Sequence, residues 1–281
     1  MVILMQTKAS FKKEALSFFR TGRFYIVAGV IFGLALFLPL MIAGTAALLS
    51  GDVPINGDLG MDMTGINEMI PSNSSTGVAM SIGGIAEIGL IVFIIFLNRA
   101  AGGEQKRRTI IIPKSSGLRS FSYLFPKYVI YPITGFILGF LGMLASYGIS
   151  LLLFDTNDIL PLNIVMASLL IGASLALYIC FHLTLGTSTG RSGLSAAICI
   201  IAAVLLPTTF STVGSEVIFN PFAMNLLAGQ TVMSGHLLNS RIMDIVFTFL
   251  FAKGIMIITF LVALFALNAR RIDNSGDERE L

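Results

Sequence analysis

The chain has 281 residues, of which 55% are hydrophobic and only 12% are charged, and its net charge is +3. An ordinary soluble domain carries about a quarter charged residues, so this composition excludes a typical soluble enzyme. Several apolar runs are long enough to cross a bilayer, and no polar stretch is long enough for a second domain. We therefore expect residues 1–281 to form one all-α, polytopic transmembrane domain.

The first element, residues 7–23, has the pattern of an amphipathic interfacial helix. Phe11, Ala15, Phe18 and Phe19 recur at helical spacing, and basic residues occupy much of the remainder. A basic helix with an aromatic face is typical of a membrane interface. The segment is either a simple membrane anchor or a helix that also contacts a cytoplasmic partner.

Six apolar segments follow. A helix needs about twenty residues to cross a bilayer, and the fifth segment is barely long enough to do so. They are 24–49, 78–97, 128–154, 162–185, 194–210 and 242–268. The segment 211–241 is also apolar, but glycines and the Asn220-Pro221 turn break it into short pieces. This pattern predicts external re-entrant helices between the fifth and sixth spans.

The segment 98–127 between the second and third spans is the most basic part of the chain. Nearly all of the 18 Lys and Arg residues lie in this segment, in 7–23, in the loop 186–193 and in the C-terminal tail. With six spans these four regions share one side of the membrane, and the positive-inside rule makes that side cytoplasmic. We expect a multi-pass protein of a bacterial plasma membrane with both termini in the cytoplasm.

Two charged residues, Glu87 and Lys253, fall inside predicted spans. A charge at the centre of a membrane helix costs at least about 2.5–3.5 kcal/mol on insertion scales, so each residue needs a partner or a function. Both lie at similar depth, and we expect them to occupy the interior of the bundle and to pair. The pair would either line a transport pathway or only fix the packing of two helices.

Catalytic and metal-binding patterns are weak in this sequence. Residues 186–190 match G-x-S-x-G around Ser188, but that motif requires a strand–turn–helix context, whereas here it lies between two membrane helices. No Walker A string is present, and no His, Cys or carboxylate cluster indicates a metal. We expect no enzymatic activity and no cofactor or metal in this chain.

The basic segment carries a more specific order of residues. Glu104 is followed by Lys106, Arg107, Arg108, Thr109, Pro113 and, at the start of the third span, Lys127. This order resembles the signature of the type-2 ABC exporter permeases, although the glycine usual before the threonine is replaced by Arg108. The helix at 7–23, the segment 211–241 and the six-span topology also resemble that family.

The resemblance implies a transport subunit that works with a separate cytoplasmic ATPase, which binds ATP and Mg²⁺. It implies a second permease copy or a paralogue as a further partner, besides membrane lipids, and no nucleic acid. The helix 7–23 and the coupling segment 98–127 would form the surface that contacts the ATPase. The residues carried over to that contact are Phe11, Glu14, Phe18, Glu104, Lys106, Arg107, Arg108, Thr109 and Pro113.

The sequence thus favours the permease of an ATP-driven exporter, with an amphipathic or hydrophobic cargo such as a peptide, drug or lipid. The alternative is a stand-alone ion-coupled carrier that uses Glu87 and Lys253. Such carriers contain internal repeats, and none is evident in this chain. An accessory membrane protein that only binds a partner is also compatible with the sequence.

Overall fold

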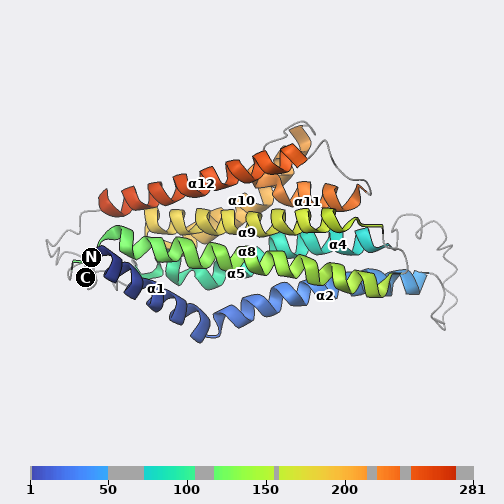
Figure 1. Cartoon of the computed structure of the whole chain (residues 1–281), viewed down its shortest axis with the longest axis horizontal. Helices are drawn as coiled ribbons and strands as arrows, with labels where there is room; N and C mark the ends of the chain where they lie inside the picture. The colour runs from blue at the N-terminus through green and yellow to red at the C-terminus, as the bar shows by residue number, and fades with distance from the viewer. Residues whose placement is uncertain are drawn as a thin grey trace.

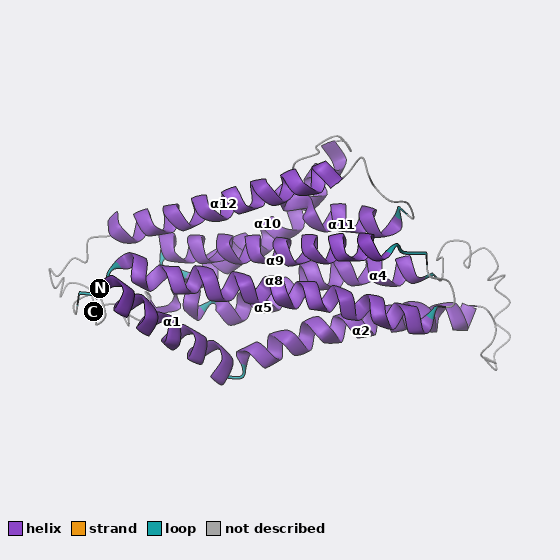
Figure 2. Ribbon diagram, in the orientation of Figure 1, coloured by secondary structure: helices purple, strands orange, loops and turns teal. Residues whose placement is uncertain are grey.

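The computed structural model describes residues 2–49, 73–104, 117–154, 158–213, 220–234 and 242–269. Within these ranges every regular element is a helix, as predicted. Figures 1 and 2 show an elongated bundle whose helices run back and forth along its long axis. Five of the described helices are long and apolar enough to cross a membrane, which indicates a multi-pass membrane protein.

The first two helices meet at a sharp bend. Helix α1 spans Val2–Arg20 and therefore begins earlier than the predicted residue 7, and α2 spans Arg23–Leu49. Between them Gly22 has φ 74°, a left-handed conformation that glycine adopts at little cost. Figure 1 shows α1 inclined against one end of the bundle, while α2 runs along it.

The second span consists of four consecutive helical pieces. They are α4 (Ser74–Gly83), the π-helix η1 (Gly84–Gly89), α5 (Leu90–Leu97) and the π-helix η2 (Arg99–Gly103). Glycines bring this span close to α2, because a Cβ atom at Gly84 would overlap Leu38 and one at Gly89 would lie 3.2 Å from Ile31. π-Helical turns are rare and occur often at functional sites.

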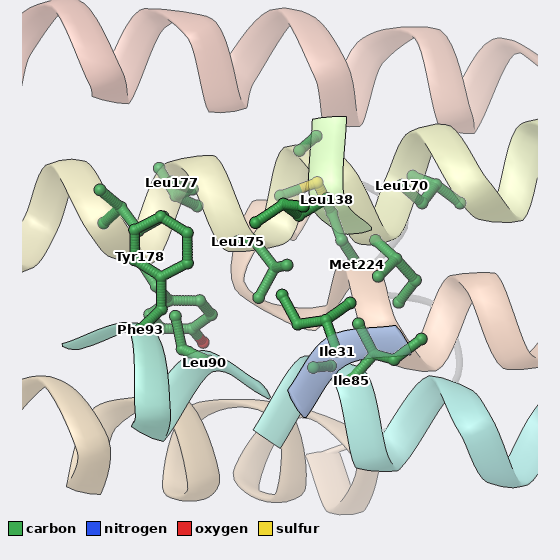
Figure 3. Close-up of a cluster of buried hydrophobic side chains, with 14 of the residues drawn as sticks. Ile31, Ile85, Leu90, Phe93, Leu138, Leu170, Leu175, Leu177, Tyr178 and Met224 are labelled. Atoms are coloured by element: carbon green, nitrogen blue, oxygen red, sulfur yellow. The ribbon is translucent and has the colours of Figure 1, made fainter. Parts of the chain in front are cut away.

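Helix α9 (Pro161–Thr189) is the centre of the bundle, since it is the most buried candidate span. It packs against α8 (Ser120–Leu153), α10 (Ser192–Val213), α11 and α12. Helix α8 begins at Ser120 rather than at the predicted residue 128, so the last part of the basic segment is helical. Figure 3 shows buried apolar side chains of α2, η1, α5, α8 and α11 around those of α9, in one continuous apolar core.

The predicted fifth span corresponds to α10, whose described apolar part, Ser192–Pro207, is shorter than the other spans. The predicted re-entrant segment contains η3 (Pro221–Ala223) and α11 (Met224–Met233), which is too short to cross a membrane. Helix α11 packs against α4 and α9. The last span is α12 (Ile242–Ala269), close to the predicted 242–268.

Candidate functional site: a buried ionic cluster at one end of the bundle

One end of the bundle, here called the Glu104 end, brings together α1, the end of η2 and the start of α8 (Figure 1). A polar cluster lies between these three elements, inside an otherwise apolar protein. We call it the Lys127 cluster, and its members are Glu14 of α1, Glu104 after η2, and Tyr123, Lys127 and Tyr131 of α8.

Lys127 is the centre of the cluster and is only 1% exposed. Its Nζ donates to Glu104 Oε2 at 2.7 Å, to the Tyr123 hydroxyl at 2.8 Å and to the carbonyl oxygen of Ala100 at 3.0 Å. An ammonium group has three donors, so all of them are used. The hydroxyl of Tyr123 in turn donates to Glu104 Oε2 at 2.6 Å, which closes a small ring of hydrogen bonds.

The second carboxylate of the cluster attaches α1. Glu14 is 5% exposed, and its Oε2 accepts a hydrogen bond of 2.7 Å from the Tyr131 hydroxyl. Its other oxygen lies 4.0 Å from Lys127 Nζ. The exposed Lys13 sits 3.5 Å from Glu104 and 3.9 Å from Glu14, so two cations balance two carboxylates.

The electrostatics of Glu104 show how strongly this ring favours the ionised form. Burial by itself raises the pKa of this carboxyl group. The charge of Lys127 and the hydrogen bonds from Lys127 and Tyr123 outweigh burial and lower the pKa to about 2. Glu104 is therefore charged at every physiological pH. Removing one partner of such a buried pair leaves the other uncompensated, which costs about 3–5 kcal/mol.

Apolar contacts hold the same helix in place. Phe18 is 2% exposed and lies between the rings of Phe93 and Tyr131, with centroid distances of 6.1 Å and 5.2 Å. Phe18 and Glu14 lie one helical turn apart, so they share the face of α1 that meets the bundle. Helix α1 is thus fixed by one charged and one aromatic anchor.

A second connection joins η2 to α9. The backbones touch directly, because a Cβ atom at Gly186 would overlap the carbonyl oxygen of Ala101 and one at Gly102 would lie 2.7 Å from the Gly186 oxygen. No side chain fits between the two helices at this crossing. The Glu104 end of the second span therefore contacts α9 through its backbone and α8 through Lys127.

The residues predicted to contact an ATPase divide into three groups. Phe11 is exposed on α1. Glu14, Phe18 and Glu104 face the bundle. Glu14 and Glu104 bind residues of α8, and Phe18 packs against Phe93 of α5. Five further residues lie outside the described part of the chain, namely Lys106, Arg107, Arg108, Thr109 and Pro113.

The predicted interior pair of Glu87 and Lys253 is wrong in this structure. Both side chains are exposed on the surface of the bundle, and no salt bridge joins them among the described residues. The inward positions of η1 are taken by Ile85, Ala86 and Gly89. Depth in the membrane was predicted from chain position, but the direction of a side chain depends on which face of the helix is packed.

The predicted turn at Asn220 and Pro221 is present. The Asn220 side chain accepts a hydrogen bond of 3.0 Å from Phe222 N and so caps η3, while Pro221 occupies its first turn. The hydroxyl of Tyr178 donates to the Phe222 carbonyl oxygen at 3.2 Å, which fixes this turn to α9.

The G-x-S-x-G match has no nucleophile geometry. Ser188 lies within α9, not in a turn after a strand. His182, which is fully buried, has its Nδ1 3.4 Å from the hydroxyl of Ser195 on α10. Among the described residues no group of three or more His, Cys, Asp or Glu side chains could hold a metal ion.

Three residues of the Lys127 cluster were missed or undervalued in the sequence. Tyr123, Lys127 and Tyr131 are spaced four residues apart on α8, so they form one polar stripe facing Glu104 and Glu14. This i, i+4, i+8 pattern at the start of an apolar span was a detectable signal. Lys127 was identified only through the family resemblance. Tyrosines are common at the ends of membrane spans, so Tyr123 and Tyr131 gave no separate signal.

Comparison with protein-family models and with curated proteins finds no match to this chain.

Proposed function

We propose that this chain is the membrane-spanning permease subunit of an ATP-driven exporter, and that its Glu104 end is cytoplasmic and docks a separate ATPase. The Lys127 cluster carries this proposal. It joins the N-terminal helix, the end of the second span and the start of the third into one unit, and these are the parts that the sequence resemblance assigns to the ATPase contact.

The surroundings of the coupling segment support the same assignment. Residues 105–116, which carry most of the signature, begin after Glu104 and end before Gly117. Helix α1 touches both sides of this interval, since Lys13 approaches Glu104 and Gln6 Nε2 donates to the Gly117 carbonyl oxygen at 3.2 Å. A partner that pushes on this segment would therefore move α1 and two spans together.

The mechanism is a rigid-body transmission. Closure of two ATPase subunits would displace the coupling segment, and the Lys127 cluster would pass this displacement to α8 while the Gly186 crossing passes it to α9. Small movements at a packed, bistable interface are amplified in this way. A second permease copy or a paralogue would complete the path for an amphipathic or hydrophobic cargo, and the energy would come from ATP on the partner subunit.

The first test is purification of the tagged full chain from its native cells in a mild detergent, with mass spectrometry and an ATPase assay. We expect a stoichiometric soluble partner that contains a Walker A motif and hydrolyses ATP. An intact, folded chain that purifies without such a partner would contradict the proposal.

The second test asks whether the Lys127 cluster couples the two subunits. Met233 is exposed at the end of α11, so a Met233→Cys probe reports movement far from the ATPase. In the assembled complex we expect its labelling rate to change with ATP and vanadate. Glu104→Arg should abolish that change while ATP hydrolysis persists, because the cluster is broken.

Asp244→Asn is the matched control, since Asp244 lies in the first turn of α12, away from the cluster. It should leave the nucleotide-dependent labelling intact. Unchanged coupling in Glu104→Arg would remove the cluster from the mechanism.

A further inference from the structure

The middle of the second span carries a charge on the outside of the bundle. Glu87 lies between Ser74 and Leu97, about 15 to 20 Å from either end of the span at 1.5 Å per residue. Its side chain is exposed, and no salt bridge to it is present among the described residues. It is the only charged residue between Ser74 and Leu97.

Lipid hydrocarbon is an unfavourable environment for this carboxylate in its ionised form. A charged side chain at the centre of the bilayer is costly, and such residues normally face a water-filled path or a protein partner. The glutamate side chain is too short to reach the membrane surface from this depth, unlike a lysine or arginine near a helix end. The face that carries Glu87 is therefore part of a pathway or is covered by protein.

The surface around Glu87 is apolar and has room. Met80, Ile88 and Ile95 are exposed on the same span, and a Cβ atom at Gly83, one turn from Glu87, would meet nothing within 4 Å. Glu87 is thus a single exposed carboxylate on an apolar surface.

This chemistry selects one kind of cation. Sodium, magnesium and calcium require several oxygen ligands, about six or more for the divalent ions, whereas the described part of this face supplies one carboxylate. A weakly hydrated organic cation needs only a counter-charge and apolar contact. We propose that Glu87 is the recognition site for a hydrophobic organic cation, so that the cargo carries an amine or quaternary onium group on an apolar body.

The proposal rests on the proposed transport function, because the ligand is taken to be the cargo. Its test can nevertheless be made without the ATPase. The full chain is placed in nanodiscs of phosphatidylcholine, whose neutral surface does not attract cations. Binding of radiolabelled tetraphenylphosphonium is measured by equilibrium dialysis, with empty nanodiscs subtracted. We expect saturable binding that the neutral analogue triphenylphosphine oxide does not displace.

Three variants make the assignment specific. Glu87→Gln keeps the shape and removes the charge, and we expect it to weaken tetraphenylphosphonium binding about tenfold or more, which is a loss of at least about 1.4 kcal/mol. Glu87→Asp should retain part of the affinity. Lys253→Met, a change at a second exposed intramembrane charge, should leave the affinity unchanged.

Equal affinity in the wild type and Glu87→Gln would overturn the proposal, as would equal competition by the neutral analogue or no saturable binding above empty nanodiscs. Each of these results would leave the docking proposal standing, because no ATPase is present. Conversely, saturable binding that depends on Glu87 would survive a failure to find an ATPase partner.

Discussion

At the scale of single residues, the structure places charge where its hydrogen bonds can be completed. Lys127 is an example at the Glu104 end, and Asp158 is an example at the opposite end. Asp158 Oδ1 accepts from the Ser74 hydroxyl at 2.6 Å and from Ser75 N at 3.0 Å, and Oδ2 accepts from the Ser75 hydroxyl at 2.6 Å. It thereby satisfies one backbone donor in the first turn of α4, the N–H of Ser75, and a helix N-terminus is a favourable place for an anion.

This geometry makes stability depend on pH at acidic values. Burial raises the pKa of Asp158, but the hydrogen bonds from Ser74 and Ser75 outweigh it and the pKa is lowered below 3.8. A lowered folded-state pKa means that the stabilisation is complete above the unfolded pKa and is lost as pH falls through the folded one. We expect Asp158→Asn to lower stability by about 1 kcal/mol at pH 7.

The measurement is thermal unfolding of both proteins in nanodiscs between pH 7 and pH 3. The difference in Tm should be constant at neutral pH and should shrink below about pH 4. Ser75→Ala should reproduce part of the effect, since it removes one of the donors. A difference that stays the same down to pH 3 would show that the stabilisation does not depend on the ionised form of Asp158.

At the scale of elements, the second span is a series of short helical pieces that contact their neighbours at a few glycines. It contains two π-helical pieces, it packs closely on α2 at Gly84 and Gly89, and its Glu104 end contacts α9 at Gly186. Contacts between backbones are intolerant of added atoms, because protein interiors are packed as densely as crystals. The crossing at Gly186 is therefore the point at which a small change has the largest expected effect on this span.

We expect Gly186→Ala to destabilise the protein by about 1–3 kcal/mol, since the new methyl group would overlap the carbonyl oxygen of Ala101 and force η2 away from α9. The measurement is the change in Tm in nanodiscs, together with the nucleotide-dependent labelling of the Met233→Cys probe. Both should be impaired.

Gly148→Ala is the matched control for this experiment. Gly148 lies on the exposed side of α8, and a Cβ atom there would meet nothing within 4 Å. Alanine favours a helix over glycine, so this change should be neutral or slightly stabilising. Equal effects of the two substitutions would mean that the Gly186 crossing has no special role.

At the scale of the whole molecule, the two intramembrane charges are exposed on different helical elements. Glu87 lies on η1 and Lys253 lies on α12, and both of these elements pack against α8 and α9. No salt bridge joins the two side chains among the described residues, so we treat them as independent sites.

Independent sites give additive effects on stability, usually within about 0.5 kcal/mol. We therefore expect the Tm changes of Glu87→Gln and Lys253→Met to add in the double variant. A double variant that is less impaired than the sum of the two would instead show that the charges meet, either in another conformation or between two copies of the chain.

The sequence by itself determined the helical class of the fold and the positions of most of its spans. The apolar runs indicated the spans because hydrophobicity over about twenty residues is a local property of the chain. Five helices of sufficient length confirm most of these segments, and the capped turn at Asn220 was also recognisable. The starts of two helices differ from the predicted residues: α1 begins at Val2 and α8 begins at Ser120. In the added part of α8, Ser122, Tyr123 and Lys127 are buried against other elements, which a pattern along the chain does not show.

Only the tertiary structure decided which faces of the helices meet. It turned Glu87 and Lys253 outward, it turned Glu14 and Phe18 inward, and it joined Glu104 to Lys127 across 23 residues of chain. These outcomes depend on long-range packing, in which small residues such as Gly186 allow close approach and larger ones prevent it. Hydrophobicity along the chain sets the position of a residue in the membrane, whereas the fit between helices sets what its side chain touches.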